Sequence, residues 1–410
     1  MREFKSYAQD GLPMSILVLR GPIFTGVEMV ENGSVVVDQS SGMIVDAGRK
    51  GDVNEPKDSK VIEDAGSTIV PGLIDAHMHF FGSRKYDILE WVTTPETLVA
   101  LRSVADARKL LRAGFTAVRD LGSKAGPHLK RAEAEGAFDG PRIVQAAKSL
   151  AQTGGNDDVP TLPIKISEEL SYSYYCDGPW ECRKAVRKVI RDGGDLIKVY
   201  SSGSMAQGTK VSPQFTLEEL EAIVDEARAV GLKVASHAYG EDALTNSIKA
   251  GVSSIEHGIG LTPEIAKEMR RQGTFYVPTL SAYLAMKTKP TEQQSILIKK
   301  HLTEDIEFAK QAGVKIVSGS DFVGCDSEPH GENYLEIVNL AKYVGSQEAL
   351  MAATSRAAEC LGLEKCGLVK TGYEANLVVV KGNPVEDAKN LAPSHVLYVV
   401  RKGRLHTVNA

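Results

Sequence analysis

The chain is poor in cysteine, and its cysteines are not spaced as pairs. Of the 410 residues, five are cysteines, and no two of them form a Cys-x-x-Cys motif. A disulfide framework or a thiolate zinc site therefore has little support, and a reducing compartment is expected. The N-terminus lacks the apolar segment of a signal peptide, and no run of about 18 apolar residues occurs that would span a membrane. We therefore expect a cytoplasmic protein without a membrane partner.

Blocks of like charge and nucleotide-binding motifs are also missing. The formal net charge of -5 is spread along the sequence, so nucleic acid is not an expected partner. No Gly-x-Gly-x-x-Gly follows an expected strand, which disfavours a dinucleotide-binding domain. With 42% hydrophobic and 25% charged residues, the composition is typical of a globular protein with a sizeable core. The expected partner is a small-molecule substrate, and a homo-oligomer stays open.

What the chain does contain is a repeated pattern of helix, glycine and strand. Each glycine supplies the left-handed cap of a helix, and the apolar run that follows it is typical of a strand buried on both faces. Six glycines follow this pattern: Gly114, Gly194, Gly231, Gly251, Gly273 and Gly313. Two more strands are expected at 69–77 and 142–147. Eight such units within about 300 residues predict an α/β fold, a (β/α)8 TIM-type barrel, in preference to a doubly wound sheet.

The two ends of the chain have a different character. Short β-type runs broken by turn residues fill residues 1–66, and similar runs occur within 372–410. Strands from both termini could complete one small sheet. We therefore expect a composite β-sandwich domain made of 1–66 and 372–410, beside a barrel domain made of 67–371.

Residue types that bind metals collect where the expected barrel strands end. Residues i and i+2 of a strand share a face, so His77 and His79 aim into one space while Met78 points into the packing. Other expected strands end near four more polar residues: Lys198, His237, His257 and Asp321. Functional groups of such barrels lie at the C-terminal ends of the strands. Because burial lowers the pKa of a lysine, a neutral amine in an apolar strand can react with CO2 to give a carbamate.

These positions lie in five segments that resemble the metal-dependent amidohydrolase superfamily. The segments, in chain order, are Gly72-Leu-Ile-Asp-Ala-His-Met-His79, Ile197-Lys198, Ser236-His237-Ala, Ile255-Glu-His257-Gly and Gly319-Ser-Asp321. More narrowly, they resemble its imidazolonepropionase-like branch, which includes Xaa-Pro dipeptidases, lysine/arginine carboxypeptidases and ochratoxin-type amidases. The resemblance is specific for the superfamily and not for a substrate.

The resemblance implies a site of two divalent metal ions, with Zn2+ as the expected metal. Six residues would hold them: His77, His79 and Asp321 on one ion, His237 and His257 on the other, and Lys198, carbamylated by CO2, as the bridge. A hydroxide between the metals would attack the carbonyl carbon of an amide. Asp321 would orient this hydroxide, take its proton and pass it to the leaving amine.

Three further residues are expected to contact the substrate. Tyr239, two residues beyond His237, would also be catalytic, by donating its hydroxyl hydrogen to the developing oxyanion. Asn156 stands where relatives commonly carry a histidine, and its neutral amide can hydrogen-bond a substrate carboxylate or carbonyl. His330 could contact substrate, with fixing of its own loop as the alternative.

The remaining candidates are expected to be structural. Arg119 and Asp120 end the second barrel strand, where a buried ion pair that braces the barrel is more expected than catalysis. Four histidines are expected to be solvated or to take part in packing: His128, His301, His395 and His406.

We therefore predict a metal-dependent hydrolase of an amide bond in a peptide-like or N-acyl amino acid substrate, of dipeptidase, carboxypeptidase or amidase type. One alternative is a cyclic amide hydrolase that opens an imidazolone or lactam ring. The other is a non-catalytic barrel protein, which is less expected because all six ligand positions are filled.

Overall fold

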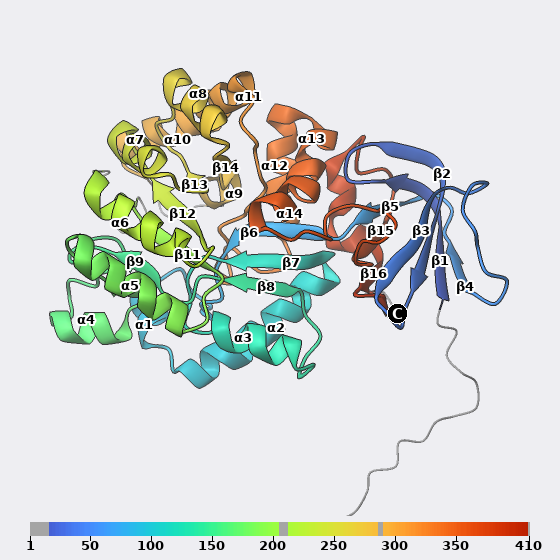
Figure 1. Cartoon of the computed structure of the whole chain (residues 1–410), viewed down its shortest axis with the longest axis horizontal. Helices are drawn as coiled ribbons and strands as arrows, with labels where there is room; N and C mark the ends of the chain where they lie inside the picture. Colours follow the sequence, from blue (N-terminus) through green and yellow to red (C-terminus); the bar gives the residue numbers. More distant parts are fainter. Residues whose placement is uncertain (1–15, 205–211, 286–289, 409–410) are drawn as a thin grey trace, which may run out of the picture.

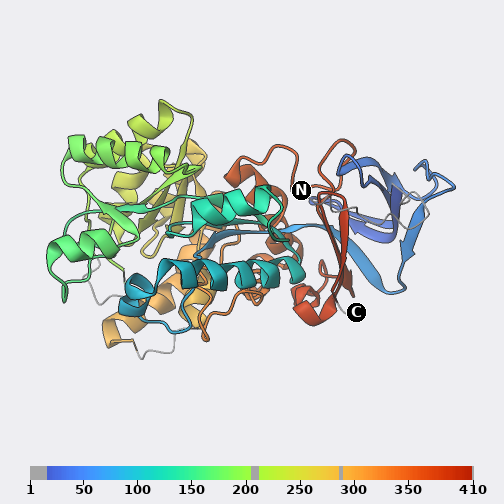
Figure 2. The same ribbon diagram turned by 90° about the horizontal axis from the view of Figure 1, so that it is seen from below.

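The computed structural model of the chain describes residues 16–204, 212–285 and 290–408. Figure 1 shows a larger part of helices and parallel strands next to a smaller part made mainly of β-strands, and Figure 2 shows the same two parts side by side after a turn of 90°. None of the described helices is both long enough and apolar enough to cross a membrane.

The smaller part is a sheet to which both ends of the described chain contribute. Its strands are β1 (Ile16–Phe24), β2 (Met29–Asp38), β3 (Met43–Arg49), β4 (Lys60–Glu63), β5 (Ser67–Pro71), β15 (Leu377–Lys381), β16 (Val396–Arg401) and β17 (Arg404–Thr407). The order is β17-β16-β15-β5-β1-β2-β3, with β4 paired to β1. Strands of the two termini therefore meet where β15 pairs antiparallel with β5. The sandwich arrangement and the division into 1–66 with 372–410 and 67–371 stay predictions.

The larger part contains two parallel sheets. One has the order β6-β7-β8, with β6 (Leu73–Met78), β7 (Phe115–Asp120) and β8 (Arg142–Gln145). The other has the order β10-β9-β11-β12-β13-β14. Its strands are β9 (Ser149–Ala151), β10 (Ser173–Tyr175), β11 (Leu196–Tyr200), β12 (Lys233–Ala238), β13 (Ser254–His257) and β14 (Phe275–Val277). Seven of the eight expected barrel strands are thus present, and β9 and β10 were not predicted.

Helices connect these strands, as the repeated pattern predicts. They are α1 (Ile88–Thr93), α2 (Glu96–Arg112), α3 (Gly126–Ala134), α4 (Ile164–Leu170), α5 (Pro179–Arg191), α6 (Leu217–Arg228), α7 (Glu241–Ala250), α8 (Pro263–Gln272), α9 (Leu280–Leu284), α10 (Glu292–Lys300), α11 (Ile306–Ala312), α12 (Tyr334–Val344), α13 (Ser346–Ala352) and α14 (Ser355–Leu361). A π-helical turn, His301–Asp305, joins α10 to α11, and two short 3-10 helices, Ala388–Leu391 and Pro393–His395, precede β16.

Five of the six expected glycines adopt the positive φ of a left-handed cap, and the sixth prediction is wrong by one residue. Gly251 and Gly273, for example, have φ of 87° and 75° after α7 and α8. At the end of α5 the positive φ belongs to Gly193, at 81°, and not to Gly194.

Two strand predictions also need correction. The run expected as one strand at 69–77 is two strands, because the chain leaves the terminal sheet at Pro71 and enters the parallel sheet at Leu73. Gly72 between them lies against Thr116, whose Oγ1 would be 2.0 Å from an added Cβ. The eighth expected strand, near 314–317, is reduced to isolated bridges, Tyr276 to Ile316 and Met78 to Phe322.

The segment after Val314 nevertheless bonds to the first and the last strand of the parallel part. The backbone N–H of Val317 donates to the carbonyl of Tyr276 at 2.8 Å, and that of Ala76 donates to Ser318 at 2.9 Å. Asp321 then adopts a left-handed φ of 60°, which ends any regular ladder. This segment is therefore held by single bonds on both sides, and it brings Asp321 next to β6.

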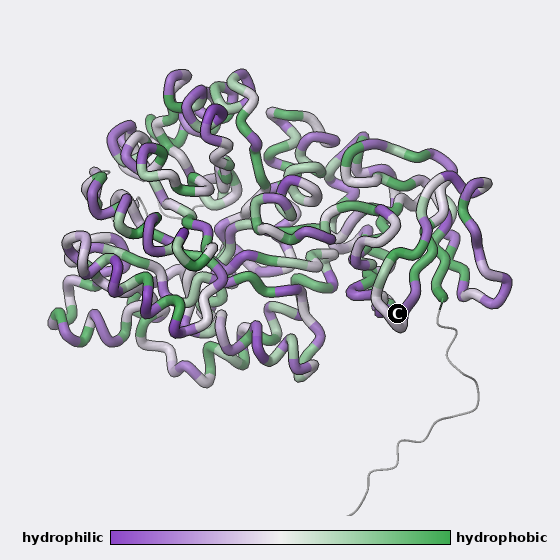
Figure 3. The backbone as a smooth tube through the Cα atoms, in the orientation of Figure 1, coloured by the Kyte–Doolittle hydropathy of each residue, from purple (hydrophilic) through white to green (hydrophobic). Residues whose placement is uncertain are grey.

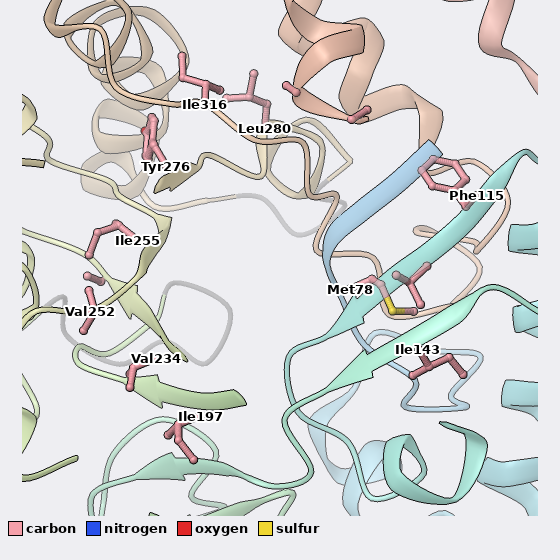
Figure 4. Packing of buried hydrophobic residues seen from close by; sticks show 14 of the residues in the cluster. Met78, Phe115, Ile143, Ile197, Val234, Val252, Ile255, Tyr276, Leu280 and Ile316 are labelled. Atoms are coloured by element: carbon pink, nitrogen blue, oxygen red, sulfur yellow. The ribbon is translucent and has the colours of Figure 1, made fainter. Parts of the chain in front are cut away.

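The largest apolar core lies between the parallel strands and their helices. Met78, Phe115 and Ile143 pack together on one side of it, and Ile197, Val234 and Ile255 line the other, as Figure 4 shows. The prediction that Met78 points into packing is confirmed. Figure 3 shows hydrophilic residues concentrated on the outer turns of the helices, as expected for amphipathic helices that cover buried strands. This core holds the strand ends that carry the polar residues described next.

Candidate metal centre

The predicted metal ligands all line one pocket at the C-terminal ends of the parallel strands. The space between its walls, including the open solvent at its mouth, is about 660 Å3. Its walls include all six: His77, His79, Lys198, His237, His257 and Asp321. Strand periodicity brings His77 and His79 together, and the parallel direction of β6, β11, β12 and β13 brings Lys198, His237 and His257 to the same edge. The segment after Val314 brings Asp321 next to β6.

Three of these residues form a compact group. Asp321 Oδ1 lies 3.1 Å from His77 Nε2 and 3.3 Å from His79 Nε2, and the three ligand atoms all lie within 4.8 Å of one another. Burial raises the pKa of the Asp321 carboxyl, but its interactions with His77, His79 and His257 outweigh burial and hold that pKa well below its usual range. Asp321 is therefore an ionised acceptor facing two imidazole nitrogens.

The outer nitrogens of the two histidines fix their tautomers. His77 Nδ1 donates to Glu256 Oε2 at 2.9 Å, and His79 Nδ1 donates to the carbonyl of Gly122 at 2.9 Å. Each ring then keeps the lone pair of Nε2 on the side of Asp321. Two imidazole nitrogens and one carboxylate form a donor set that fits a divalent metal ion such as zinc.

The side chain of Asp75 holds the backbone next to Asp321 in place. Asp75 Oδ1 accepts hydrogen bonds from the backbone N–H groups of His77 and Ser320, at 3.0 and 3.1 Å. Asp75 Oδ2 accepts one from Asn333 Nδ2 at 2.7 Å. One buried carboxylate thus joins β6 to the segment that carries Asp321, which holds the donor group in place.

His237 and His257 lie beside this group. Their ring centroids are 4.6 Å apart, and His257 Nδ1 is 2.7 Å from Thr279 Oγ1. Burial, reinforced by nearby cationic groups, lowers the pKa of His237 to about 3 and that of His257 well below its usual value. Both rings are therefore neutral, which is the form that binds metals.

Lys198 is fully buried in β11. Its Nζ lies 3.4 Å from His77 Nε2 and 5.0 Å from the centre of the Tyr200 ring. No carboxylate among the described residues lies within ion-pair distance of it. Burial lowers its pKa to about 8, although Glu256 and Asp321 act in the opposite direction. Near neutral pH a larger fraction of this amine is therefore neutral than in an exposed lysine.

The residue that sequence reasoning missed at this centre is Glu256. Besides His77, it accepts a hydrogen bond from Arg119 Nη2 at 2.8 Å and one from Ser254 Oγ at 2.5 Å. The predicted buried ion pair of Arg119 thus exists, but its partner is Glu256 and not Asp120, because consecutive residues of a strand point to opposite faces. Asp120 accepts instead from Ser123 Oγ at 2.5 Å. In the sequence, the only signal for Glu256 was its position directly before His257.

The predicted substrate contacts divide into two groups. Tyr239 and Asn156 both line the pocket, and the Tyr239 hydroxyl is 2.8 Å from that of Tyr283. His330 is not among the residues that line it. Its Nε2 donates to the carbonyl of His79 at 3.0 Å, and its ring packs on Phe80. The substrate role of His330 therefore stays a prediction, beside the alternative that it fixes its own loop.

Aromatic side chains that the sequence did not single out form much of the remaining wall: Phe81, Tyr86, Trp91, Tyr172, Tyr200 and Tyr283. Phe81 and Tyr200 could have been found, because they lie two residues beyond His79 and Lys198 and share their faces if the strands continue. The four histidines expected to be structural, His128, His301, His395 and His406, do not line this pocket. His301, for example, is buried between Asp305 and the carbonyl of Pro278.

Gly319 offers a test of how tightly this centre is packed. An added Cβ would lie 2.7 Å from His77 Cβ, 2.8 Å from His77 N and 2.6 Å from Val277 Cγ1. Gly319→Ala is therefore expected to lower the free energy of unfolding by about 1–3 kcal/mol. Because the clash displaces His77, kcat should fall by about 10-fold to 100-fold. Urea denaturation and steady-state kinetics measure the two effects.

The matched control is Gly51→Ala, because no atom lies within 4 Å of a Cβ added there. It should leave both quantities unchanged. Equal stability of the two variants would show that the packing around His77 is looser than these distances imply.

Comparison with known proteins identifies the family. The model of the Amidohydrolase family matches residues 68–406. Ochratoxinase from Aspergillus niger is 31% identical over 416 residues, which cover 92% of this chain and 83% of that protein.

Solved structures agree in fold over almost the whole chain. The crystal structure of A. niger ochratoxinase has a TM-score of 0.86 at 27% identity and covers 95% of both chains. A prolidase complexed with N-methylphosphonate-L-proline has a TM-score of 0.84 at 32% identity, over 96% of this chain and 99% of that one. A Xaa-Pro dipeptidase with bound methionine has a TM-score of 0.82 at 30% identity, over 96% and 100%. These similarities assign a TIM-barrel-like α/β fold, and the chain belongs to the amidohydrolase family, in its Xaa-Pro dipeptidase-like branch.

Proposed function

We propose that the protein is a metal-dependent hydrolase that cleaves the amide bond of a peptide-like or N-acyl amino acid substrate. The observation that carries the proposal is the group of His77, His79 and Asp321, whose ligand atoms lie within 4.8 Å of one another in a pocket. Divalent metal ions, with Zn2+ expected, supply a hydroxide nucleophile near neutral pH and polarise the scissile carbonyl when they are bound.

The second part of the proposal is a two-metal centre. His237 and His257 would hold the second ion, and Lys198, carbamylated by CO2, would bridge the two. The neutral state of both rings supports this assignment, as does the position of Lys198 Nζ at 3.4 Å from His77 Nε2. A carbamate has two oxygens, so it can contact two cations as a carboxylate does.

Two side chains of the protein move protons in this scheme. Asp321 accepts the proton of the attacking nucleophile and transfers it to the leaving amine. Tyr239 donates its hydroxyl hydrogen to the oxyanion that develops on the substrate. Tyr283 supports this role, because its own O–H can donate to Tyr239 across 2.8 Å and leave the Tyr239 hydrogen for the substrate. Both groups lie in the wall of the same pocket.

The family and the architecture support the reaction class. Membership supports a hydrolase that acts on C–N bonds, and the relatives named ochratoxinase, prolidase and Xaa-Pro dipeptidase lead us to an amide of an amino acid. We also propose that 67–371 form a closed (β/α)8 barrel beside a composite β-sandwich of 1–66 and 372–410. The bonds of Val317 to β14 and of Ala76 to Ser318 support this closure.

The test is an amide panel assayed on protein of measured metal content. We expect hydrolysis of at least one dipeptide or N-acyl amino acid, its loss on chelation, and its return on adding zinc with bicarbonate. Hydrolysis of lactams or imidazolones alone would establish the cyclic amide alternative instead. Fewer than one metal per chain, with no activity gained on adding zinc, would favour a non-catalytic barrel.

A further inference from the structure

Thr279 has a backbone conformation that a β-branched residue rarely adopts. It directly precedes α9, with φ of 51° and ψ of 46°, which lie in the left-handed region. The residue is fully buried, and within the described range Leu280–Leu284 its side chain caps no backbone N–H of α9. A strained residue persists only where its surroundings hold it, and such residues cluster at functional sites. The Thr279 hydroxyl is therefore used outside the helix that it precedes.

Buried groups on both sides hold the backbone at Thr279. The carbonyl of Pro278 accepts a hydrogen bond from His301 Nε2 at 2.9 Å. The carboxylate of Glu336, in α12, accepts two more from the first two backbone N–H groups of α9, at 3.0 and 2.7 Å. Both His301 and Glu336 are fully buried. These three hydrogen bonds keep Thr279 in its strained conformation.

In this conformation the Thr279 hydroxyl contacts a residue proposed to bind the second metal ion. Thr279 Oγ1 lies 2.7 Å from His257 Nδ1. With Nδ1 against the hydroxyl, Nε2 is the ring nitrogen that remains for a metal. Its lone pair is available only when Nδ1 carries the ring hydrogen. Thr279 Oγ1 then accepts this hydrogen and fixes both the tautomer and the orientation of the His257 ring.

The same hydroxyl also acts on two tyrosines of the pocket. Tyr283 lies in α9, one helical turn after Thr279. Burial raises the pKa of Tyr283 well above its usual value, and a hydrogen bond donated by Thr279 acts against this rise. The hydroxyls of Tyr283 and Tyr239 lie 2.8 Å apart. Each hydroxyl has one hydrogen to donate, so a chain that starts at His257 Nδ1 can run in only one direction, toward Tyr239.

We propose that Thr279 is a positioning residue that couples the second metal site to the oxyanion donor. Its oxygen orients His257, and its hydrogen sets the direction of the Tyr283 hydroxyl. Tyr283 then donates to Tyr239, whose own hydrogen is left for the substrate. This inference rests on the proposed function and adds to it the residue that links its two parts.

Zinc binding to the metal-free protein, with bicarbonate present, tests the link to His257. Competition with a chromogenic chelator measures the affinity for each ion without any substrate. Thr279→Val keeps the shape of the side chain but removes the hydroxyl, so it should weaken the binding of one of the two ions by about 10-fold to 100-fold. Thr279→Ser keeps the hydroxyl and should leave both affinities within about 3-fold of the wild type.

The matched control is Thr274→Val. Thr274 is also buried, but it lies at the opposite end of β14, where its hydroxyl donates to the carbonyl of Val252 at 3.5 Å. Its replacement should change neither zinc affinity. Melting temperatures of all variants establish that they are folded.

Kinetics on the zinc-saturated protein test the link to Tyr239. Tyr283→Phe keeps the ring but removes the donor to Tyr239, so kcat should fall by about 5-fold to 10-fold, while KM and both zinc affinities stay within about 3-fold. At saturating zinc, Thr279→Val should lower kcat by a similar factor. Because both variants act through the same hydroxyl, the double variant should lose about as much as the more affected single variant.

Each part of the inference can fail by itself. Unchanged zinc affinity in Thr279→Val, a loss that Thr279→Ser does not restore, or a loss in the double variant equal to the product of the single losses would overturn the inference and leave the proposed function in place. A wild-type protein that binds fewer than two ions, or that hydrolyses no amide, would overturn the proposed function, and this inference with it.

Discussion

Asp321→Asn is expected to lower kcat by about 100-fold or more while the metal content stays close to that of the wild type. The amide oxygen of asparagine can occupy the place of Oδ1, which lies 3.1 Å from His77 Nε2 and 3.3 Å from His79 Nε2. An amide cannot accept a proton from the nucleophile, however, so the step that needs a base is lost. Steady-state kinetics and inductively coupled plasma mass spectrometry measure the two quantities.

The control for this variant is Asp326→Asn. Asp326 is an exposed carboxylate five residues further along the same segment, and its replacement changes the net charge by the same amount. We expect turnover within about 2-fold of the wild type, since surface substitutions have small effects. Near-normal turnover in Asp321→Asn would remove the proton-transfer role from Asp321. Loss of both the metal and the activity would show that Asp321 acts mainly as a metal ligand. Another group would then have to transfer the proton.

Lys198→Ala is expected to have the larger effect, a loss of about 1,000-fold in kcat, because a metal that polarises the carbonyl contributes several kcal/mol to the transition state. Lys198 lies in the middle of β11 with its Nζ 3.4 Å from His77 Nε2, so alanine leaves a gap where the carbamate would bridge the ions. The metal content should fall to one ion per chain or less. Formate, acetate or propionate in the buffer should restore part of the activity by placing a carboxylate in that gap.

The control is Lys233→Ala in the neighbouring strand β12. Lys233 lies at the opposite end of its strand from His237, and its Nζ donates to the carbonyls of Glu359 and Cys360 at 3.0 and 2.7 Å. Its removal should leave the metal content and the response to carboxylic acids unchanged. If Lys198→Ala keeps two tightly bound metals per chain, the carbamate proposal is wrong.

The sequence predicts this site well where the chemistry follows strand periodicity. His77 and His79 lie two residues apart, and Lys198, His237 and His257 lie at or near the ends of apolar runs, so parallel strands alone bring them to one edge. The segment before Asp321 shows where this reasoning stops. Its pairing depends on single backbone bonds and on the side chain of Asp75, which a pattern of apolar residues does not encode.

The missed features depend on contacts between distant segments. The partner of Arg119 is Glu256, 137 residues away, and the hydrophobic pattern could not distinguish it from the adjacent Asp120. Asn156 donates to the adjacent Asp157, which also accepts a hydrogen bond from Ser173, 16 residues away. Residue type can place a side chain in a pocket wall, but only the folded chain decides which partners its atoms have.

The joining of the two chain ends in one sheet has a consequence for biosynthesis. Thr68 donates its hydroxyl hydrogen to the carbonyl of Gly382, 314 residues later, and β5 continues through Gly72 into the strand that carries His77. On the ribosome, β1 to β6 emerge first, yet β5 must wait for β15 to be translated before it gains its second neighbour. Until then the nascent chain exposes an unpaired strand edge close in sequence to His77 and His79. The sheet that leads into β6 can therefore be completed only after the C-terminal strands have been translated.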